Sequence, residues 1–195
     1  MTDTLPTALN KLLSSCSPNL LETHSKTPAA VLLLIYLKEG DYCLHLQKRA
    51  RHLEHHGSEA SFPGGTPEAQ DENLLQTALR ETYEEEGIRP EDVTILGQMN
   101  DTPTRTGYVM KVFVGTIPYP YPFRPNPAEV EELIEVPLKA LQSADCWREE
   151  AYWQDGQTVS TNSYVFGPHI IYGATANIVR QFLDLLLRLQ NNGIQ

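Results

Sequence analysis

The longest apolar run in the chain, AAVLLLIYL, covers the nine residues from Ala29 to Leu37. A helix that crosses a bilayer needs roughly 20 apolar residues, so this run is too short to do so. Its length and its branched side chains instead predict a buried strand. A turn at residues 39–41 and the alternating stretch YCLHLQKR at 42–49 follow, which predicts a second strand paired with the first as a hairpin.

Length and charge exclude several classes of protein. The chain has 195 residues, of which 41% are hydrophobic and 21% charged, typical of one globular domain with a core of its own. Its net charge of −10 argues against a nucleic-acid partner, which needs a basic face, and against an anionic membrane surface. A chain this acidic needs metal ions or a local basic patch in order to handle phosphates.

The cysteines and the first ten residues suggest a compartment. Cys16, Cys43 and Cys146 are odd in number, scattered, and match no disulfide or zinc pattern, which favours free thiols in a reducing compartment. Residues 1–10 lack the basic and apolar stretches of a secretory signal. We therefore expect a soluble cytoplasmic protein.

Hydrophobic spacing predicts the remaining elements. Strands before and after a central helix indicate a mixed α/β class. Residues 1–28 are expected to form an N-terminal helical extension and residues 29–195 the main domain. The expected elements are helices at 7–15, 71–86 and 174–189, strands at 93–99, 107–117, 132–136 and 158–166, and a proline-rich loop at 117–127.

Acidic residues crowd the end of the helix predicted at 71–86, for which Asp71 is the expected N-cap. With Leu74 at zero and 100° per residue, Glu85 falls at about 20°, Glu81 at about 340° and Glu84 at about 280°. These three carboxylates share one arc beside the buried face, whereas Glu86, at about 120°, is expected on another side.

Three carboxylates on one arc need a positive partner, and Mg²⁺ or Mn²⁺ suits hard oxygen ligands. The alternative is a solvated acidic face. The metal interpretation is favoured because Arg80 directly precedes Glu81, because the helix follows a Gly-Gly turn, and because glutamates near a helix C-terminus oppose the helix dipole.

The segment from Gly65 through Arg80-Glu81-Thr82-Tyr83-Glu84-Glu85-Glu86-Gly87-Ile88 resembles the signature of the Nudix hydrolases. The resemblance implies an α/β/α sandwich around a mixed sheet over residues 29–195. It also implies cleavage of a nucleoside diphosphate linked to another moiety, with Mg²⁺ or Mn²⁺ held by Glu81, Glu84 and Glu85. Thr82 replaces the usual aliphatic residue, and the upstream acidic position is Asp71 with five spacer residues or Glu72 with six.

The flanking sequence is similar to the coenzyme A pyrophosphatase branch of this family. The similarity lies in FPGG at 62–65 with the residues before it, TRTGYVMKVFVG at 104–115, NPAEVEELIEVPL at 126–138 and HIIYGATANIVRQFLDLL at 169–186. It implies hydrolysis of coenzyme A to 4′-phosphopantetheine and adenosine 3′,5′-bisphosphate. Ser58 stands at the branch's glycine position and Lys111-Val112 at its Thr-Pro, which puts substrate preference in question more than chemistry.

A basic cluster precedes the Gly-Gly turn in this acidic chain. Arg49 and Arg51 are candidates for phosphate binding because the arginine fork suits phosphate oxygens, the alternative being solvated charges at a hairpin end. The neighbouring His52, His55 and His56 lack convincing zinc spacing. In the proline-rich loop, the aromatic side chains either stack on an adenine or cap the core, and we expect the core: Tyr119, Tyr121 and Phe123.

The resemblance also implies catalytic roles. Arg80 orients a motif glutamate, the general base is Glu81 or the loop carboxylate Glu129, and the backbone of Gly64 and Gly65 shapes the metal loop. The expected partner is a small nucleotide substrate such as coenzyme A, with NADH, ADP-ribose or a non-catalytic nucleotide sensor as alternatives. Both a monomer and a homodimer remain open.

Overall fold

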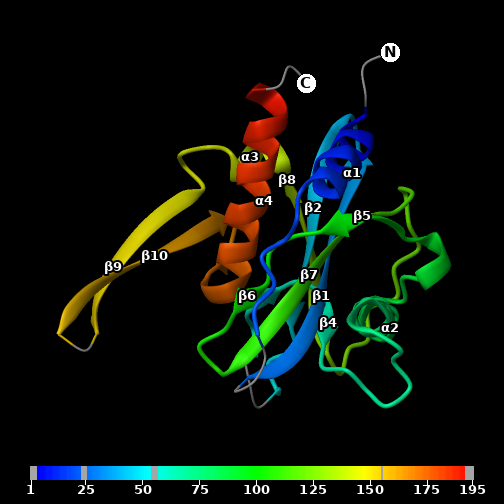
Figure 1. Ribbon diagram of the computed structural model, residues 1–195, viewed down its shortest axis with the longest axis horizontal. Helices are drawn as coiled ribbons and strands as arrows, with labels where there is room; N and C mark the ends of the chain where they lie inside the picture. The colour runs from blue at the N-terminus through cyan, green and yellow to red at the C-terminus, as the bar shows by residue number, and fades with distance from the viewer. Residues whose placement is uncertain (1–3, 23–25, 54–56, 155, 192–195) are drawn as a thin grey trace.

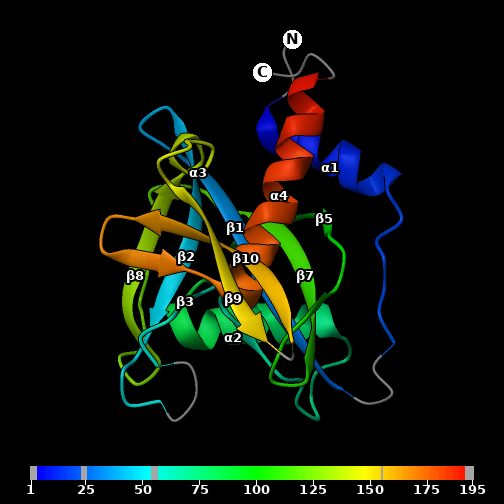
Figure 2. The same ribbon diagram turned by 90° about the vertical axis from the view of Figure 1, so that its left-hand side faces the viewer.

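The computed structural model describes residues 4–22, 26–53, 57–154 and 156–191. Figures 1 and 2 show its elements in two views. Their bounds are α1 (Leu5–Ser15), β1 (Thr27–Lys38), β2 (Asp41–Arg49), β3 (Ala60–Ser61), β4 (Gly64–Gly65), α2 (Leu74–Glu86), a 3₁₀ turn (Pro90–Asp92), β5 (Thr94–Gln98), β6 (Thr102–Pro103), β7 (Tyr108–Thr116), β8 (Val130–Pro137), α3 (Leu138–Leu141), β9 (Trp147–Gln154), β10 (Gln157–Phe166), β11 (His169–Ile171) and α4 (Gly173–Asn191).

The main sheet is mixed, with β1 at its centre. β1 pairs in parallel with β7 and antiparallel with β2, where Leu34 lies opposite His45. β5 extends the sheet beyond β7, and β8 pairs with the other edge of β2. The hairpin predicted at 29–37 and 42–49 is therefore confirmed. A smaller antiparallel sheet is formed by β9, β10 and β11.

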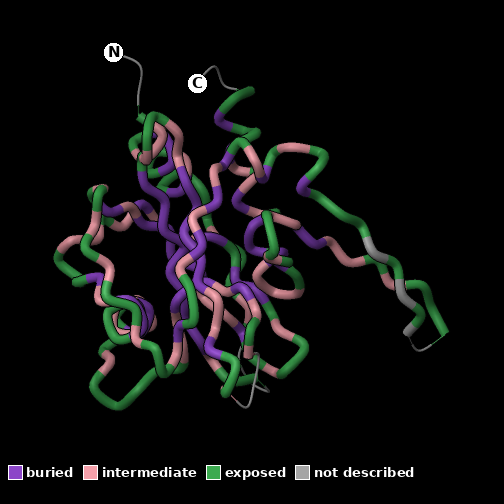
Figure 3. The backbone as a smooth tube through the Cα atoms, turned by 180° about the vertical axis from the view of Figure 1, so that it is seen from behind, coloured by how far each residue is buried: buried purple, intermediate pink, exposed green. Residues whose placement is uncertain are grey.

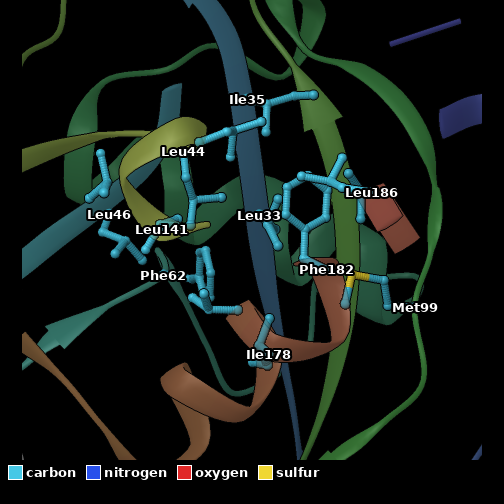
Figure 4. Packing of buried hydrophobic residues seen from close by; sticks show 14 of the residues in the cluster. Leu33, Ile35, Leu44, Leu46, Phe62, Met99, Leu141, Ile178, Phe182 and Leu186 are labelled. Carbon is cyan, nitrogen blue, oxygen red and sulfur yellow. The ribbon is translucent and has the colours of Figure 1, made fainter. Parts of the chain in front are cut away.

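Helices cover both faces of the main sheet because β1 is apolar on both sides. Leu33 and Ile35 belong to a core cluster shared with α1 and α4, whereas the alternating Leu32 and Leu34 belong to a second cluster shared with α2. Figure 4 shows Leu33 beside Phe182 of α4. In Figure 1, α2 lies on one side of the sheet and α4 on the other, which confirms the mixed α/β class.

Both terminal helices pack on the face away from α2. The helix α1 contacts β5 and α4, and its Ala8, Leu9 and Leu13 are buried in the larger cluster. The proposed division after residue 28 stays a prediction, and it falls within β1, which begins at Thr27. No helix in the described part of the chain is long and apolar enough to cross a membrane.

The structure differs from the sequence predictions at the start of α2, in strand β9 and in short elements that were not predicted, among them α3 and β11. The helix α2 begins at Leu74 with Asn73 as its N-cap, so the expectation of Asp71 is wrong: Asn73 Oδ1 accepts the backbone N–H groups of Leu75 and Gln76 at 3.0 and 3.1 Å. The sequence also missed β9, whose residues WREEAYWQ show no clean alternation. β9 and β10 form a hairpin that projects from the body of the molecule, with mostly exposed residues (Figure 3).

Candidate metal and active site on helix α2

Three carboxylates meet where α2 faces the loop that leads into β8. Oxygen atoms of Glu81, Glu85 and Glu129 all lie within 4.8 Å of one another. They form the one group of this kind in the part of the chain that the structure describes. Glu85 is almost fully buried, with 2% of its side chain exposed, and Glu81 and Glu129 are half-buried. The helix therefore presents two carboxylates on one side, and the loop supplies a third.

The Gly-Gly turn makes room for these carboxylates. Gly64 and Gly65 form β4, which pairs with the start of β1, and the backbone N–H of Gly64 donates to Glu85 Oε2 at 3.0 Å. A Cβ at Gly65 would overlap the carboxylate of Glu81. Gly64 has a φ of +149° and passes so close to Ala30 O that a Cβ would overlap it. Gly64 therefore requires glycine, whereas a side chain at Gly65 would displace the carboxylate of Glu81.

Arg80 binds the acidic residues on either side of it. Its Nη2 lies 3.0 Å from both Asp71 Oδ2 and Glu81 Oε1, and its Nη1 lies 3.0 Å from Glu84 Oε2. The guanidinium lowers the pKa of Asp71 to about 2. Of the two upstream acidic candidates, Asp71 is thus the one that contacts the signature arginine, whereas the exposed Glu72 contacts Gln76.

Glu84 lies apart from the group of three. Its side chain is 49% exposed and is held by Arg80.

Burial raises the pKa of the two glutamates of α2 that belong to the group. The pKa of Glu85 rises to about 8, although the N–H of Gly64 opposes this shift. The pKa of Glu81 is also raised by burial, and Arg80 opposes that shift. A bound divalent cation would favour the ionised form of both carboxylates.

Asn126 connects Glu129 to the helix. Its backbone N–H donates to the carbonyl of Glu85 at 2.8 Å, and its side-chain amide donates to Glu129 Oε1 at 3.1 Å. The N–H of Glu129 returns a bond to Asn126 O at 2.9 Å. The position of the third carboxylate therefore depends on the loop at 118–129 and on its attachment to the end of α2.

The basic cluster divides into two parts. Arg49 lies at the site, with its Nη1 3.6 Å from Glu85 Oε1. Arg51 is 76% exposed and donates to Glu131 Oε2 at 3.2 Å, so it does not reach the carboxylates. His55 and His56 lie outside the described residues, and His52 is exposed and not part of the acidic group.

Sequence reasoning placed Glu86 on another side of the helix, outside the site, and missed His45. Both side chains are fully buried, and His45 Nε2 lies 2.8 Å from Glu86 Oε2. The helical angle of Glu86 could have indicated its burial, because on the helix it lies next to the buried Thr82.

The preference for a core role of the loop aromatics is confirmed, because Tyr119, Tyr121 and Phe123 pack on the cluster beneath α2.

The residues present fit a divalent metal ion. Carboxylate oxygens are the ligands that Mg²⁺ and Mn²⁺ prefer, and the three described here converge from two segments of chain. Glu84 adds a fourth carboxylate on the same helix, exposed to solvent. Arg49 supplies a positive charge that suits an anionic substrate at the same place.

Comparisons with known proteins identify the family of the chain. The NUDIX domain model matches residues 26–157, more than half of the chain. Two relatives are described as uncharacterized Nudix hydrolases, NudL. The protein from Photorhabdus laumondii is 35% identical over 153 residues, covering 78% of this chain and 81% of the relative, and that from Yersinia enterocolitica is 35% identical over 158 residues, covering 78% of each.

Solved structures support the fold. The NUDIX domain of Shewanella oneidensis NrtR, solved with ADP-ribose, superposes with a TM-score of 0.55 at 17% identity and covers 90% of this chain and 97% of that domain. A MutT/nudix family protein from Enterococcus faecalis gives a TM-score of 0.54 at 16% identity, with 94% and 70% coverage. The expected α/β/α sandwich is thus confirmed. The chain belongs to the Nudix family, as a hydrolase of pyrophosphate bonds in nucleoside diphosphate derivatives.

Proposed function

We propose that this enzyme hydrolyses the diphosphate of coenzyme A or its derivatives to 4′-phosphopantetheine and adenosine 3′,5′-bisphosphate. The observation that carries the proposal is the convergence of Glu81, Glu85 and Glu129 within 4.8 Å, beside the guanidinium of Arg49. This arrangement suits a dication and a diphosphate together. The choice of coenzyme A rests on the similarity of the flanking sequence to the coenzyme A pyrophosphatase branch.

We assign the metal ligands to Glu81, Glu84 and Glu85, with the carboxylate of Glu129 at the same site. When bound, Mg²⁺ or Mn²⁺ would polarise the phosphoryl oxygens and lower the pKa of a coordinated water. Glu129 or Glu81 accepts the proton of the attacking water, since both carboxylates are only half-buried. The two remain alternatives for the general base.

The surrounding groups orient these carboxylates. Arg80 holds Glu81 and Glu84 in place through charged hydrogen bonds, and the backbone of Gly64 fixes Glu85. Gly65 keeps the space beside Glu81 open. Arg49 is the stronger candidate for a phosphate contact, and Arg51 would have to leave Glu131 in order to make one.

The test is metal-dependent turnover with product identification. Coenzyme A, NADH and ADP-ribose are incubated with the protein and Mg²⁺ or Mn²⁺, and the products are separated by mass. We expect 4′-phosphopantetheine and adenosine 3′,5′-bisphosphate, formed fastest from coenzyme A. Glu85→Gln should abolish the reaction, and Glu72→Gln, the same change at an exposed residue next to α2, serves as the matched control.

Other outcomes are equally informative. If NADH or ADP-ribose is cleaved faster than coenzyme A, that compound becomes the proposed substrate, and the proposed metal site is unaffected. Binding of nucleotides without cleavage would favour the nucleotide sensor.

We also propose a cytoplasmic location, which fits the free thiols Cys16, Cys43 and Cys146, and a monomer or homodimer as the working form.

A further inference from the structure

A buried ionisable pair joins the central sheet to the end of the catalytic helix. His45 of β2 and Glu86, the last residue of α2, have no exposed side-chain surface, and their Nε2 and Oε2 atoms are 2.8 Å apart. Removing such a pair from water is costly, and apolar side chains of similar volume often give equal or greater stability. Stability alone therefore gives no reason for this pair.

The orientation of the histidine is set on its other side. Its Nδ1 lies 3.3 Å from the hydroxyl oxygen of Tyr36, and that hydroxyl donates to Glu135 Oε1 at 2.8 Å. Lys38 pairs with the second oxygen of Glu135. Because the one hydroxyl proton of Tyr36 goes to Glu135, its oxygen accepts from Nδ1–H of His45. The imidazole is thus held at both ring nitrogens, by Tyr36 on one side and by Glu86 on the other.

The same pair holds the loop that follows β7. The ring of Phe123 stacks on the imidazole of His45, with centroids 5.1 Å apart and planes inclined by 6°. The next residue, Arg124, donates its backbone N–H to the carbonyl of Glu86 at 2.8 Å. The loop is therefore attached to the histidine through a side chain and to the glutamate through the backbone.

Five residues beyond Arg124, this loop delivers the carboxylate of Glu129 to the site. Asn126 bonds to the carbonyl of Glu85 and to both the backbone and the side chain of Glu129. Glu85 and Glu129 belong to the carboxylate group, and Glu86 directly follows Glu85 in the chain. The buried pair thus lies where the helix end, strand β2 and the loop meet, one residue from a candidate ligand.

We propose that His45 and Glu86 are positioning residues, which fix the end of α2 and the loop at 118–129 so that Glu85 and Glu129 stay within reach of the same metal ion. The inference rests on the proposed metal site. Groups that orient metal ligands without touching the metal typically contribute roughly 10–100-fold to metal affinity or activity.

The decisive variant replaces both partners with apolar residues, His45→Leu together with Glu86→Leu. Mn²⁺ affinity is measured by calorimetry without substrate, next to the thermal unfolding midpoint, kcat and KM. We expect an unfolding midpoint equal to or above that of the wild type. Mn²⁺ affinity and kcat should nevertheless fall by roughly 10–100-fold, with KM little changed. Wild-type Mn²⁺ affinity and kcat in the double variant would overturn the proposal.

Single substitutions decide the question if the double variant does not fold. Glu86→Gln keeps a hydrogen-bonding group opposite His45 and should retain most of the Mn²⁺ affinity, whereas Glu86→Ala should lose it. Equal affinity in these two variants, whether high or low, would overturn the proposal. In the wild type, the bound Nδ1–H of His45 should give a downfield, slowly exchanging proton resonance that Glu86→Ala shifts.

A control separates positioning from loss of stability. Asp101 has a fully buried side chain, paired with Lys111 of β7 at 3.2 Å and bonded to the backbone N–H of Leu21. Asp101→Asn should lower the unfolding midpoint and leave Mn²⁺ affinity unchanged, and an equal loss of affinity there would overturn the inference. If the wild type binds no Mn²⁺, both the proposed function and the positioning role fail. If the wild type and the double variant bind Mn²⁺ equally, only the positioning role fails.

Discussion

The helices α2 and α4 pack on opposite faces of the same sheet, and they do so with different side chains. α4 buries an apolar stripe: Ala176, Ile178, Val179, Phe182, Leu186 and Leu189. α2 buries mainly polar and acidic groups: Thr77, Ala78, Thr82, Glu85 and Glu86. An apolar stripe is enough to hold a helix on a sheet, and buried carboxylates cost free energy. The difference indicates that α4 serves stability, whereas α2 gives up stability for a site.

The largest effect is expected for a substitution in α2 that removes one of its buried carboxylates. Glu85→Gln removes a candidate ligand and should cost about 5 kcal/mol of transition-state stabilisation, within the several kcal/mol that a metal supplies. At 1.36 kcal/mol per tenfold, this is roughly a 10⁴-fold loss in kcat/KM. The metal-free variant should unfold at the same temperature as the wild type or higher, because a buried carboxylate has been neutralised. Steady-state kinetics and calorimetry check both expectations.

A second substitution tests α4. Phe182 is fully buried in the larger core cluster, so Phe182→Ala should lower the free energy of unfolding by about 3–5 kcal/mol. The part of the sample that remains folded should keep its kcat, since the ring lies on the face of the sheet away from α2 (Figure 4). Denaturant unfolding and active-site titration measure the two quantities. A kcat that falls with stability would show that the two faces are not independent.

The contrast between these helices also explains what the sequence could predict. The apolar stripe of α4 and the common side of Glu81 and Glu85 follow from local spacing, so both were predicted, whereas Glu84, predicted on the same arc, lies apart from them. The burial of Glu86 was not, because its partner His45 lies 41 residues away in the chain and a glutamate is normally exposed. The strand β9 was missed for a similar reason, since its ladder with β10 depends on a tertiary partner and not on alternation.

A smaller effect is expected at the start of α2. Asn73 Oδ1 accepts two backbone N–H groups of the first turn, and Asn73→Ala should cost about 1 kcal/mol of stability. Thr4→Ala is the matched control, because Thr4 occupies the N-cap of α1 without a capping bond from its side chain. Thermal unfolding of the two variants should differ by several degrees. Equal midpoints would mean that packing alone, as in α4, determines where α2 begins.

The smallest expected effect is a pH dependence that belongs to α2. Arg80 binds Asp71 and lowers its folded-state pKa to about 2, below the roughly 3.9 of an unfolded chain. The stabilisation from this pair is therefore complete above about pH 4 and is lost as the pH falls toward 2. The unfolding midpoint of metal-free Asp71→Asn should lie below that of the wild type at pH 6, and the two should converge near pH 2. Asp184→Asn, the same change on the exposed face of α4, gives the baseline. A difference at Asp71 that stays constant with pH would mean that Arg80 holds this residue by hydrogen-bond geometry and not by charge, and α2 would then resemble α4 more closely than its acidic face suggests.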